Sequence, residues 1–405
     1  MGEENKQVIN IIGIGMVDGL TLTEAASEAI TDSDAIFGAE RVIEPFADFG
    51  KPLFKTWDAS EIAEVIHRKG FERPCVLVSG DCGFYSAAIG LAEKLDKKLE
   101  NYRAELICGI ATPVYFSSKI RIPWQDMKFV SLHGEINNVL RPICRNKYCF
   151  FLLGGDISAG DICGAMSDHG LGDIKVYIGE DLGYPTEKIT VDSARKLANR
   201  PFENLCVLVT ENIGYERNIP VGIPDEEFIR GDVPMTKSEV RAVIMSKLGV
   251  GDGDICWDIG CGTGSVTVEM ALNCGSGMVY AADSSDTAAE LTENNCKKFR
   301  CDNALVYWGK APEILADFPE PDCVFIGGSG GRLEEILHAV FRTAKSGARV
   351  VVTAVTLNTL ELCRRTFSEN GITAEIVQAA FARVGVDTTM MTALNPIFII
   401  KGIIP

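Results

Sequence analysis

The sequence predicts an α/β protein built from two domain-sized halves. Strand-like and helix-like segments alternate through both halves, which is the pattern of sheets whose strands are connected by helices. Residues 254–264 are typical of a buried strand that runs into a glycine-rich turn and a helix start. Residues 213–233 contain proline and glycine without sustained periodicity, which is typical of a linker. We therefore expect domains at residues 1–212 and 234–405.

In the first half, short apolar runs bounded by turn residues predict the strands, and apolar residues at helical spacing predict the helices. The expected strands are residues 8–14, 76–79, 105–108, 149–153, 175–178 and 205–209. The expected helices are residues 23–29, 86–95 and 159–168.

The same patterns predict the elements of the second half. The expected strands are residues 254–259, 277–282, 304–308, 323–326, 349–353, 373–377 and 393–400, and the expected helices are residues 237–248, 264–271, 287–299, 333–344 and 357–369. Thr236 or Ser238 could cap the first of these helices, with Glu239 at capping-box spacing after Thr236. The alternative role for Thr236 is to close over a bound cofactor.

The glycine turn predicts a site for a ligand that contains a nucleoside. Glycines at 260, 262 and 264 allow a tight turn and close approach of a ligand, and the following helix directs free N–H groups into that turn. Asp283 ends the next strand at about the 20-residue spacing at which an acid binds a ribose diol. The order D-x-G-x-G-x-G from Asp258 differs from the dinucleotide fingerprint and resembles the first motif of Rossmann-like S-adenosylmethionine methyltransferases. A glycine turn without a ligand is the alternative.

Composition excludes several classes of function. The net charge of −17 over 405 residues argues against non-specific binding of nucleic acid, which needs a basic face. The first residues lack the layout of a signal peptide, and no apolar run is long enough for a membrane span, so we expect a cytoplasmic protein without a membrane partner. The 14 cysteines form no C-x-x-C and have no histidine nearby, so we expect no metal or iron–sulfur site.

Several motifs of the second half occur together in a recognisable order, at residues 235–241, 258–267, 311–313, 325–331 and 393–396. By these motifs, residues 230–402 resemble the precorrin C15-methyltransferase/decarboxylase family of the corrin pathway. The resemblance implies a cofactor site formed by Thr236, Gly260, Cys261, Gly262, Thr263, Gly264, Asp283 and Ala311. Lys310 replaces an acidic residue that is frequent in the family, which puts an adenine contact there in doubt. The second glycine loop, with Gly328, Ser329 and Gly330, is expected to face the substrate.

The first half contains a second set of motifs, at residues 11–22, 78–86, 108–114, 131–134 and 179–185. By these motifs, residues 8–212 resemble the tetrapyrrole methylase family, and specifically its C5-methyltransferase branch. This resemblance implies a two-lobed α/β fold with the cofactor near Gly13, Gly15, Ser79, Gly80, Asp81, Gly83, Ala111 and Thr112. Met16 replaces the usual proline of the first turn. Asp81 could instead only cap its turn.

Together the halves resemble the fused precorrin-6Y C5,15-methyltransferases (decarboxylating) of cobalamin biosynthesis. The resemblance implies S-adenosyl-L-methionine as cofactor, a precorrin-6Y-type tetrapyrrole as substrate, with or without cobalt, and catalysis mostly by positioning and exclusion of water. Arg121 and Arg383 are expected to pair with substrate carboxylates, since arginine suits forked carboxylate contacts. We also expect a homo-oligomer that does not bind nucleic acid. The alternatives are a methyltransferase acting on RNA or protein, or one half that is a degenerate scaffold without catalysis.

Overall fold

The computed structural model describes residues 6–16, 21–133, 139–154, 157–203, 205–216, 221–384 and 389–405. The chain forms two compact units, one of residues 1–135 and 146–213 and the other of residues 136–145 and 214–405. The second unit therefore includes ten residues from within the first half of the sequence. Within the described residues, no helix has both the length and the apolar character needed to cross a membrane.

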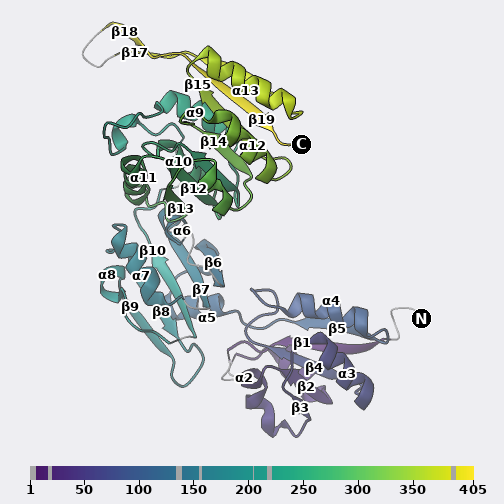
Figure 1. Ribbon diagram of the computed structural model, residues 1–405. Coiled ribbons are helices and arrows are strands. Elements are labelled where there is room, and N and C mark those ends of the chain that lie inside the picture. The colour runs from purple at the N-terminus through teal and green to yellow at the C-terminus, as the bar shows by residue number, and fades with distance from the viewer. Residues whose placement is uncertain are drawn as a thin grey trace. The chain divides into compact units, whose positions relative to one another are not determined.

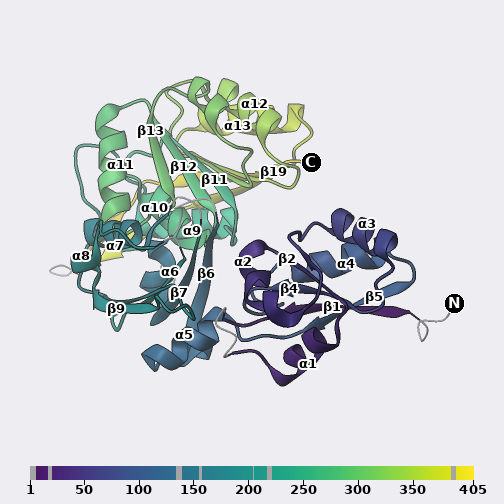
Figure 2. The ribbon, with the colours of Figure 1, turned by 90° about the horizontal axis from the view of Figure 1, so that it is seen from below.

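The first sheet of the first unit is entirely parallel, with the strand order β3-β2-β4-β1-β5. Its elements, in chain order, are β1 (Gln7–Gly13), α1 (Glu24–Asp32), β2 (Ala35–Gly38), α2 (Glu40–Ile43), η2 (Glu44–Phe49), β3 (Leu53–Phe54), α3 (Ala59–Lys69), β4 (Pro74–Val78), α4 (Ala88–Lys98) and β5 (Tyr102–Ile107). Alternate residues of β1 enter two cores, because successive side chains of a strand point to opposite faces. Ile9 and Ile11 pack with α3 and α4, whereas Ile12 packs with α1 and α2. Figure 2 shows α1 on the opposite side of this sheet from α3 and α4.

The second sheet of the first unit is mixed, with the strand order β6-β7-β10-β8-β9. Strands β6 and β7 are parallel, and β10 is antiparallel to both of its neighbours, β7 and β8. The elements are α5 (Thr112–Ile120), η3 (Trp124–Asp126), β6 (Met127–His133), β7 (Tyr148–Gly154), α7 (Ala159–Asp168), β8 (Lys175–Glu180), β9 (Lys188–Ser193), α8 (Ala194–Leu197) and β10 (Cys206–Glu211). The first unit thus has two α/β lobes, each with its own sheet (Figure 1).

The second unit contains a seven-stranded sheet of order β13-β12-β11-β14-β15-β19-β16. Its elements are α6 (Leu140–Arg145), η4 (Asp225–Glu227), α9 (Ser238–Leu248), β11 (Ile255–Ile259), α10 (Ser265–Asn273), β12 (Met278–Asp283), α11 (Asp286–Lys298), β13 (Ala304–Trp308), η5 (Glu313–Asp317), β14 (Cys323–Ile326), α12 (Leu333–Thr343), β15 (Arg349–Ala354), α13 (Leu357–Glu369), β16 (Glu375–Ala379), β17 (Ala382–Val384), β18 (Met391–Ala393) and β19 (Ile397–Ile403). Strands β11 to β15 are parallel, and β19 is antiparallel to β15 and β16. Because the strand order reverses direction between β11 and β14, a ligand is expected at their carboxyl ends.

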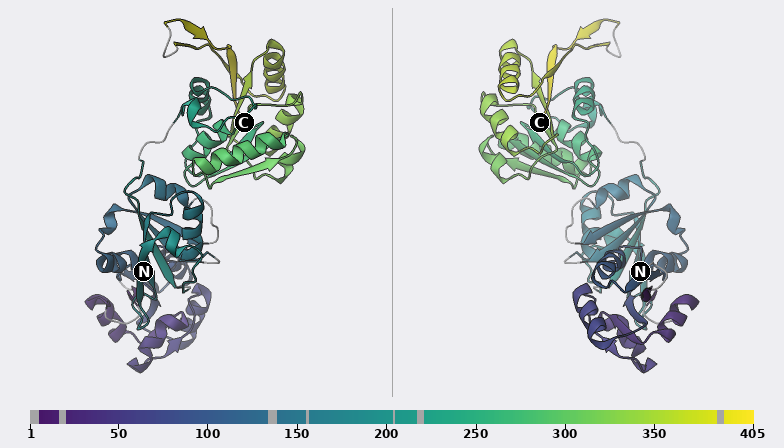
Figure 3. Two further views of the ribbon diagram at one scale, coloured as in Figure 1. Left: turned by 90° about the vertical axis from the view of Figure 1, so that its left-hand side faces the viewer. Right: turned by 90° about the vertical axis from the view of Figure 1, so that its right-hand side faces the viewer.

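Helices cover both faces of this sheet. Helices α9, α10 and α11 pack in one core with Cys256, and α12 and α13 pack in another with Trp257, the next residue of β11. Strands β17 and β18 form a separate two-stranded hairpin, which Figure 3 shows extending away from the large sheet. The hairpin carries exposed apolar side chains, among them Val384, Met390 and Met391.

The predicted α/β class is confirmed, and most predicted elements occur within a few residues of their expected positions. The expected strand at residues 393–400 is wrong in extent, because β18 ends at Ala393 and β19 begins at Ile397. Elements such as β2, α3, α5, β6 and β9 were not predicted. The fourteen cysteines are free thiols, of which Cys108 is exposed, and the described residues hold no cluster of three potential metal ligands.

Candidate functional site

The two glycine loops of the second unit meet at the switch point of the sheet. Gly260 has a φ of 74°, and a Cβ on it would lie 2.6 Å from the Gly328 nitrogen. The N–H groups of Gly327 and Gly328 donate to the Ile259 carbonyl at 2.9 and 3.3 Å. Any side chain at 260 would therefore push the loops apart, so this position requires glycine.

Asp283 lies beside this turn at the end of β12 and is half-buried. Its Oδ2 accepts the N–H of Gly262 at 3.0 Å, and its Oδ1 accepts the N–H of Ser285 at 2.9 Å. Each carboxylate oxygen has a second lone pair, so Asp283 can hold the turn and still accept hydroxyl donors from a ligand.

Two buried side chains of α11 donate hydrogen bonds to the backbone of the glycine turn. The Thr292 hydroxyl donates to the Gly262 carbonyl at 3.1 Å, and Asn295 Nδ2 donates to the Thr263 carbonyl at 2.9 Å. A Cβ on Gly264 would lie 2.7 Å from Thr292, so α11 packs directly against the glycine turn. The sequence analysis did not single out Thr292 and Asn295. Their only signal was a pair of polar residues at i, i+3 spacing on a helix.

Asp258, the acid of the glycine motif, is fully buried. It accepts a hydrogen bond from the Thr267 hydroxyl at 2.5 Å, whereas its Oδ1 has no hydrogen-bond partner among the described residues. Burial raises the pKa of Asp258 to about 7, and the nearby Asp283 charge adds to the increase. Asp258 therefore supports the turn from inside the protein.

The segment before α9 lies against the same turn. A Cβ on Gly262 would lie 3.2 Å from the Pro234 carbonyl oxygen. The predicted cap is wrong, because α9 begins after Lys237 and neither Thr236 nor Ser238 caps it with its side chain. The N–H of Ser238 instead donates to Asp225 Oδ1 at 3.0 Å.

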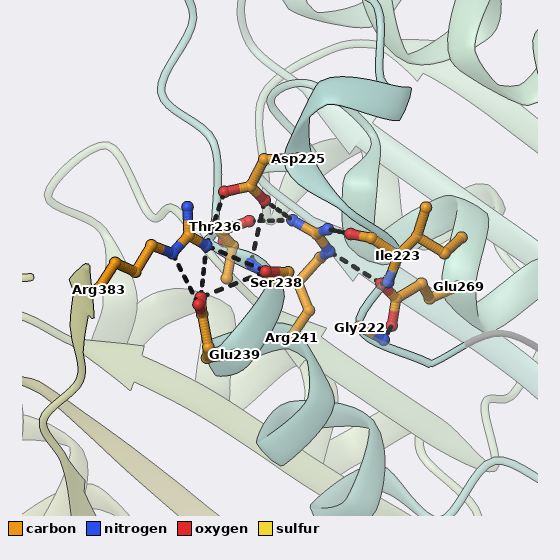
Figure 4. A network of polar contacts seen from close by, with 9 residues as sticks. All are labelled: Gly222, Ile223, Asp225, Thr236, Ser238, Glu239, Arg241, Glu269 and Arg383. Carbon is orange, nitrogen blue, oxygen red and sulfur yellow. Dashed lines mark hydrogen bonds and ion pairs between the residues drawn. The ribbon is translucent and has the colours of Figure 1, made fainter. Parts of the chain in front are cut away.

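Arg241 anchors this segment from a fully buried position (Figure 4). Its Nε donates to Glu269 Oε1 at 2.9 Å, and its Nη1 donates to Asp225 Oδ1 at 3.0 Å. It also donates to the backbone carbonyls of Thr236 and Ile223. Because Glu269 belongs to α10, this network connects the segment around Thr236 to the helix that follows the glycine turn.

Arg383 belongs to the same network (Figure 4). Its Nε donates to Glu239 at 2.7 Å, and its Nη2 lies 3.1 Å from Asp225. This pairing lowers the pKa of Glu239 to about 2. Arg383 is thus held by the protein's own carboxylates, and a substrate carboxylate would have to compete with them.

Ala311 lies in a turn that Arg332 ties to the second glycine loop. Arg332 donates to the Ala311 carbonyl at 3.3 Å and makes a two-pronged contact with Glu313 at 2.7 and 2.8 Å. Its own N–H donates to the Ser329 carbonyl at 2.9 Å. Arg332 holds the loop that contains Ser329 and Gly330, and the sequence analysis did not identify it.

The predicted glycines of the first unit also come together at strand ends. Gly15 and Gly80 exchange backbone hydrogen bonds at 3.0 and 2.9 Å, and a Cβ on Gly13 would lie 2.7 Å from the Gly80 carbonyl and 2.8 Å from the Gly109 nitrogen. Gly109, which the sequence analysis did not select, therefore completes this close approach.

Asp81 caps two loops at once. Its Oδ1 accepts the N–H of Gly83 at 2.8 Å, and its Oδ2 accepts the N–H of Gly109 at 3.2 Å. Ala111 is the N-cap residue of α5 and Thr112 its first residue, so a helix begins beside these loops. Ser79 is exposed just before Gly80. A structural role for Asp81 is thus visible, and a direct ligand contact stays a prediction.

Met16 and Arg121 differ in their settings. Met16 is buried, its N–H donates to the Thr21 hydroxyl at 2.7 Å, and its side chain packs against Gly183 of the other lobe.

Arg121 is exposed at the end of α5, with a φ of 57°. Among the described residues no ion pair of Arg121 occurs, so its guanidinium is available to a ligand.

Comparison with known proteins places both halves in families. Residues 227–400 match the model of the precorrin methyltransferase domain, and residues 8–198 match that of the tetrapyrrole (corrin/porphyrin) methylases. A probable cobalt-precorrin-6B C(15)-methyltransferase (decarboxylating) of Pyrobaculum calidifontis is 45% identical over 186 residues, which cover 45% of this chain and 95% of the relative. A precorrin-6Y C(5,15)-methyltransferase [decarboxylating] of Sinorhizobium sp is 28% identical over 358 residues, covering 86% of this chain and 84% of the relative.

A solved structure of a precorrin-6Y C5,15-methyltransferase from Geobacter metallireducens is 39% identical, with a TM-score of 0.44, and covers 45% of this chain and 97% of that one. The protein described here is a methyltransferase with α/β folds in both units. It belongs to the family of precorrin-6Y C5,15-methyltransferases (decarboxylating).

Proposed function

We propose that the protein methylates two meso carbons of precorrin-6Y, or of its cobalt form, with S-adenosyl-L-methionine and removes carbon dioxide from an acetate side chain in corrin biosynthesis. The observation that carries this proposal is the meeting of Gly260 and Gly328 at the switch point, with the Asp283 carboxylate beside them. The Sinorhizobium relative, which matches 86% of this chain, is named for both methylations and for decarboxylation.

The residues at the switch point fit the proposed cofactor. The close approach of Gly260 to Gly328 leaves a surface without side chains, and Asp283 has acceptor capacity for the two ribose hydroxyls. Thr236, Cys261, Thr263 and Ala311 complete the proposed set in this unit. In the first unit, the proposed set is Gly13, Gly15, Ser79, Gly80, Asp81, Gly83, Ala111 and Thr112.

The cofactor would supply a methyl group already activated on a sulfonium. The protein's own residues then have to hold the acceptor carbon in line and exclude water. Among the described residues we assign no nucleophile or metal to the reaction. For the decarboxylation, the macrocycle would take up the electron pair released from the carboxylate carbon, while the protein orients that carboxylate.

We further propose a division of labour, with residues 1–212 as the C5-type domain, 213–233 as linker and 234–405 as the C15-type and decarboxylating domain. Truncation at the linker is a poor test, because α6 belongs to the second unit and the N–H of Leu140 donates to Asp302 there at 2.8 Å. Point variants of the full chain avoid this problem.

The test uses Gly13→Ala and Gly260→Ala, each of which places a Cβ within 2.7 Å of backbone atoms. Precorrin-6Y and its cobalt form are each offered as substrate, and mass spectrometry follows the products. Gly13→Ala should abolish the methylation that occurs without loss of carbon dioxide, and Gly260→Ala should abolish the decarboxylating one. If either variant loses both reactions or neither, the division is refuted. Failure of the wild-type chain to methylate either precorrin-6Y or its cobalt form refutes the function.

The same assay addresses the alternatives. If one half were degenerate, the variant that disables the other half would add no methyl group at all. A methyltransferase that acts on RNA or protein would instead methylate those substrates when they are offered in place of the tetrapyrrole. We also propose a cytoplasmic enzyme that binds neither nucleic acid nor membrane, consistent with its free thiols. The exposed apolar residues of the β17–β18 hairpin support a homo-oligomer, which light scattering would measure.

A further inference from the structure

Tyr85 has an unusual backbone conformation next to the cofactor loop proposed for the first unit. Its φ is 45°, in the left-handed region that side chains with a Cβ rarely adopt. The other described non-glycine residues with positive φ lie at positions where this conformation is common. Arg121, Asn199 and Arg300 follow the ends of helices, and Asp181 is an aspartate in a turn. Tyr85 alone among the described residues places an aromatic side chain in this conformation within a loop.

The residues on either side hold Tyr85 in place. The Phe84 ring makes edge contacts with Phe129 and Phe150 of the second sheet, at centroid distances of 5.4 and 6.1 Å. On the other side, the Ser86 hydroxyl accepts the N–H of Ala88 at 3.2 Å where α4 begins. A strained residue persists only where its surroundings determine its conformation, and such residues concentrate at ligand sites.

This arrangement presents the Tyr85 side chain to solvent. The residue is 52% exposed although it is a large aromatic, and its ring meets Phe84 edge-on at 4.9 Å. Its hydroxyl has no hydrogen bond to any other residue that the structure describes. The strained backbone is therefore not explained by a hydrogen bond of the Tyr85 hydroxyl within the described protein. Glycine would adopt this backbone conformation more easily.

We propose that Tyr85 contacts the tetrapyrrole in the first unit, with its ring packed against the macrocycle and its hydroxyl donating to a carboxylate arm. A phenol combines a rigid apolar ring with a polar tip, which suits a flat conjugated ring that carries acidic side chains. Tyr85 lies two residues after Gly83 of the proposed cofactor loop, so one loop would position both reactants. This inference rests on the proposed function.

The test compares Tyr85→Gly, Tyr85→Phe and the control Asn199→Gly in the full-length chain. The initial rate of the methylation of precorrin-6Y without loss of carbon dioxide is measured by mass spectrometry, together with the melting temperature. Tyr85→Gly should raise the KM for precorrin-6Y about tenfold or more, while melting at or above the wild-type temperature because the left-handed conformation suits glycine. Tyr85→Phe should raise the KM a few-fold. Asn199→Gly relieves a left-handed residue in the same unit and should leave the KM unchanged.

A Tyr85→Gly variant with the wild-type KM would overturn the inference and leave Tyr85 as a turn residue only. A raised KM together with a large fall in melting temperature would also overturn it, because the loop would then have lost its structure. If the wild-type chain neither binds nor methylates precorrin-6Y or its cobalt form, the proposed function fails as well. The wild-type measurement separates that outcome from a failure of Tyr85 alone.

Discussion

Replacement of Asp283 by alanine tests the proposed ribose contact most directly. Its carboxylate accepts two backbone N–H groups, from Gly262 and Ser285, and has acceptor capacity left for a ligand. A hydrogen bond to a charged acceptor contributes about 1.5–3 kcal/mol. Loss of the ligand contacts, with some loosening of the turn, should therefore weaken the binding of S-adenosylmethionine by about 1–3 kcal/mol, or about 5- to 150-fold. Asp283→Asn keeps one acceptor oxygen and should have a smaller effect.

The assay is the KM for S-adenosylmethionine in the decarboxylating methylation, with the other methylation as an internal control in the same chain. Asp286→Ala is the matched variant, because it removes an exposed carboxylate three residues away at the start of α11. An Asp283→Ala enzyme whose KM matches that of Asp286→Ala would refute the ribose assignment. An equal rise in both methylations would show a general effect on the protein.

Three further predictions concern charged groups. Arg241→Met should lower the free energy of unfolding in urea by about 3–5 kcal/mol, because it leaves Asp225 and Glu269 buried without their partner. Arg364→Met removes an exposed ion pair and should have a much smaller effect, and equal effects would contradict this prediction. The raised pKa of Asp258, about 7, means that the folded state keeps a proton that the unfolded state releases near pH 4. The free energy of unfolding of the second unit should therefore decrease as the pH rises from about 4 to 7, and Asp258→Asn should remove this pH dependence. An unchanged pH dependence in that variant would show that another group is responsible. Arg121→Gln and Arg383→Gln should each raise the KM for precorrin-6Y at low salt, by an amount that shrinks as salt rises, with Arg364→Gln as the neutral control; full activity of both variants at low salt would mean that other groups hold the carboxylates.

The sequence predicted those features that local chemistry determines. The glycine turn at 260–264 and Asp283 were found because the strand, turn, helix and acid are close in sequence, and the strands of the large sheet were found because buried parallel strands are continuous apolar runs. Helix α5 was not predicted, although Thr112, its first residue, had been selected as a site residue.

Features that depend on distant contacts could not be predicted. Asp225 is 13 residues from the N–H of Ser238 that it caps, and Arg383 is 144 residues from Glu239. The local spacing of Thr236 and Glu239 favoured a capping box. Instead, the Glu239 carboxylate pairs with Arg383, and Asp225 accepts the N–H of Ser238. Likewise, the strain at Tyr85 depends on Phe84 packing against a sheet that begins more than 40 residues later.

The exposed thiol of Cys108 makes the first unit suitable for labelling with a thiol-reactive dye. Of the fourteen thiols, Cys108 is exposed, and it directly precedes Gly109, whose N–H is held by Asp81. The neighbouring Cys82 is buried, and its pKa is raised to about 11, so it stays protonated and unreactive at neutral pH. A maleimide dye would therefore attach next to the glycine loops without any engineered mutation. Protection of Cys108 from the dye by added S-adenosylmethionine would then report occupancy of that loop cluster in the unmodified enzyme.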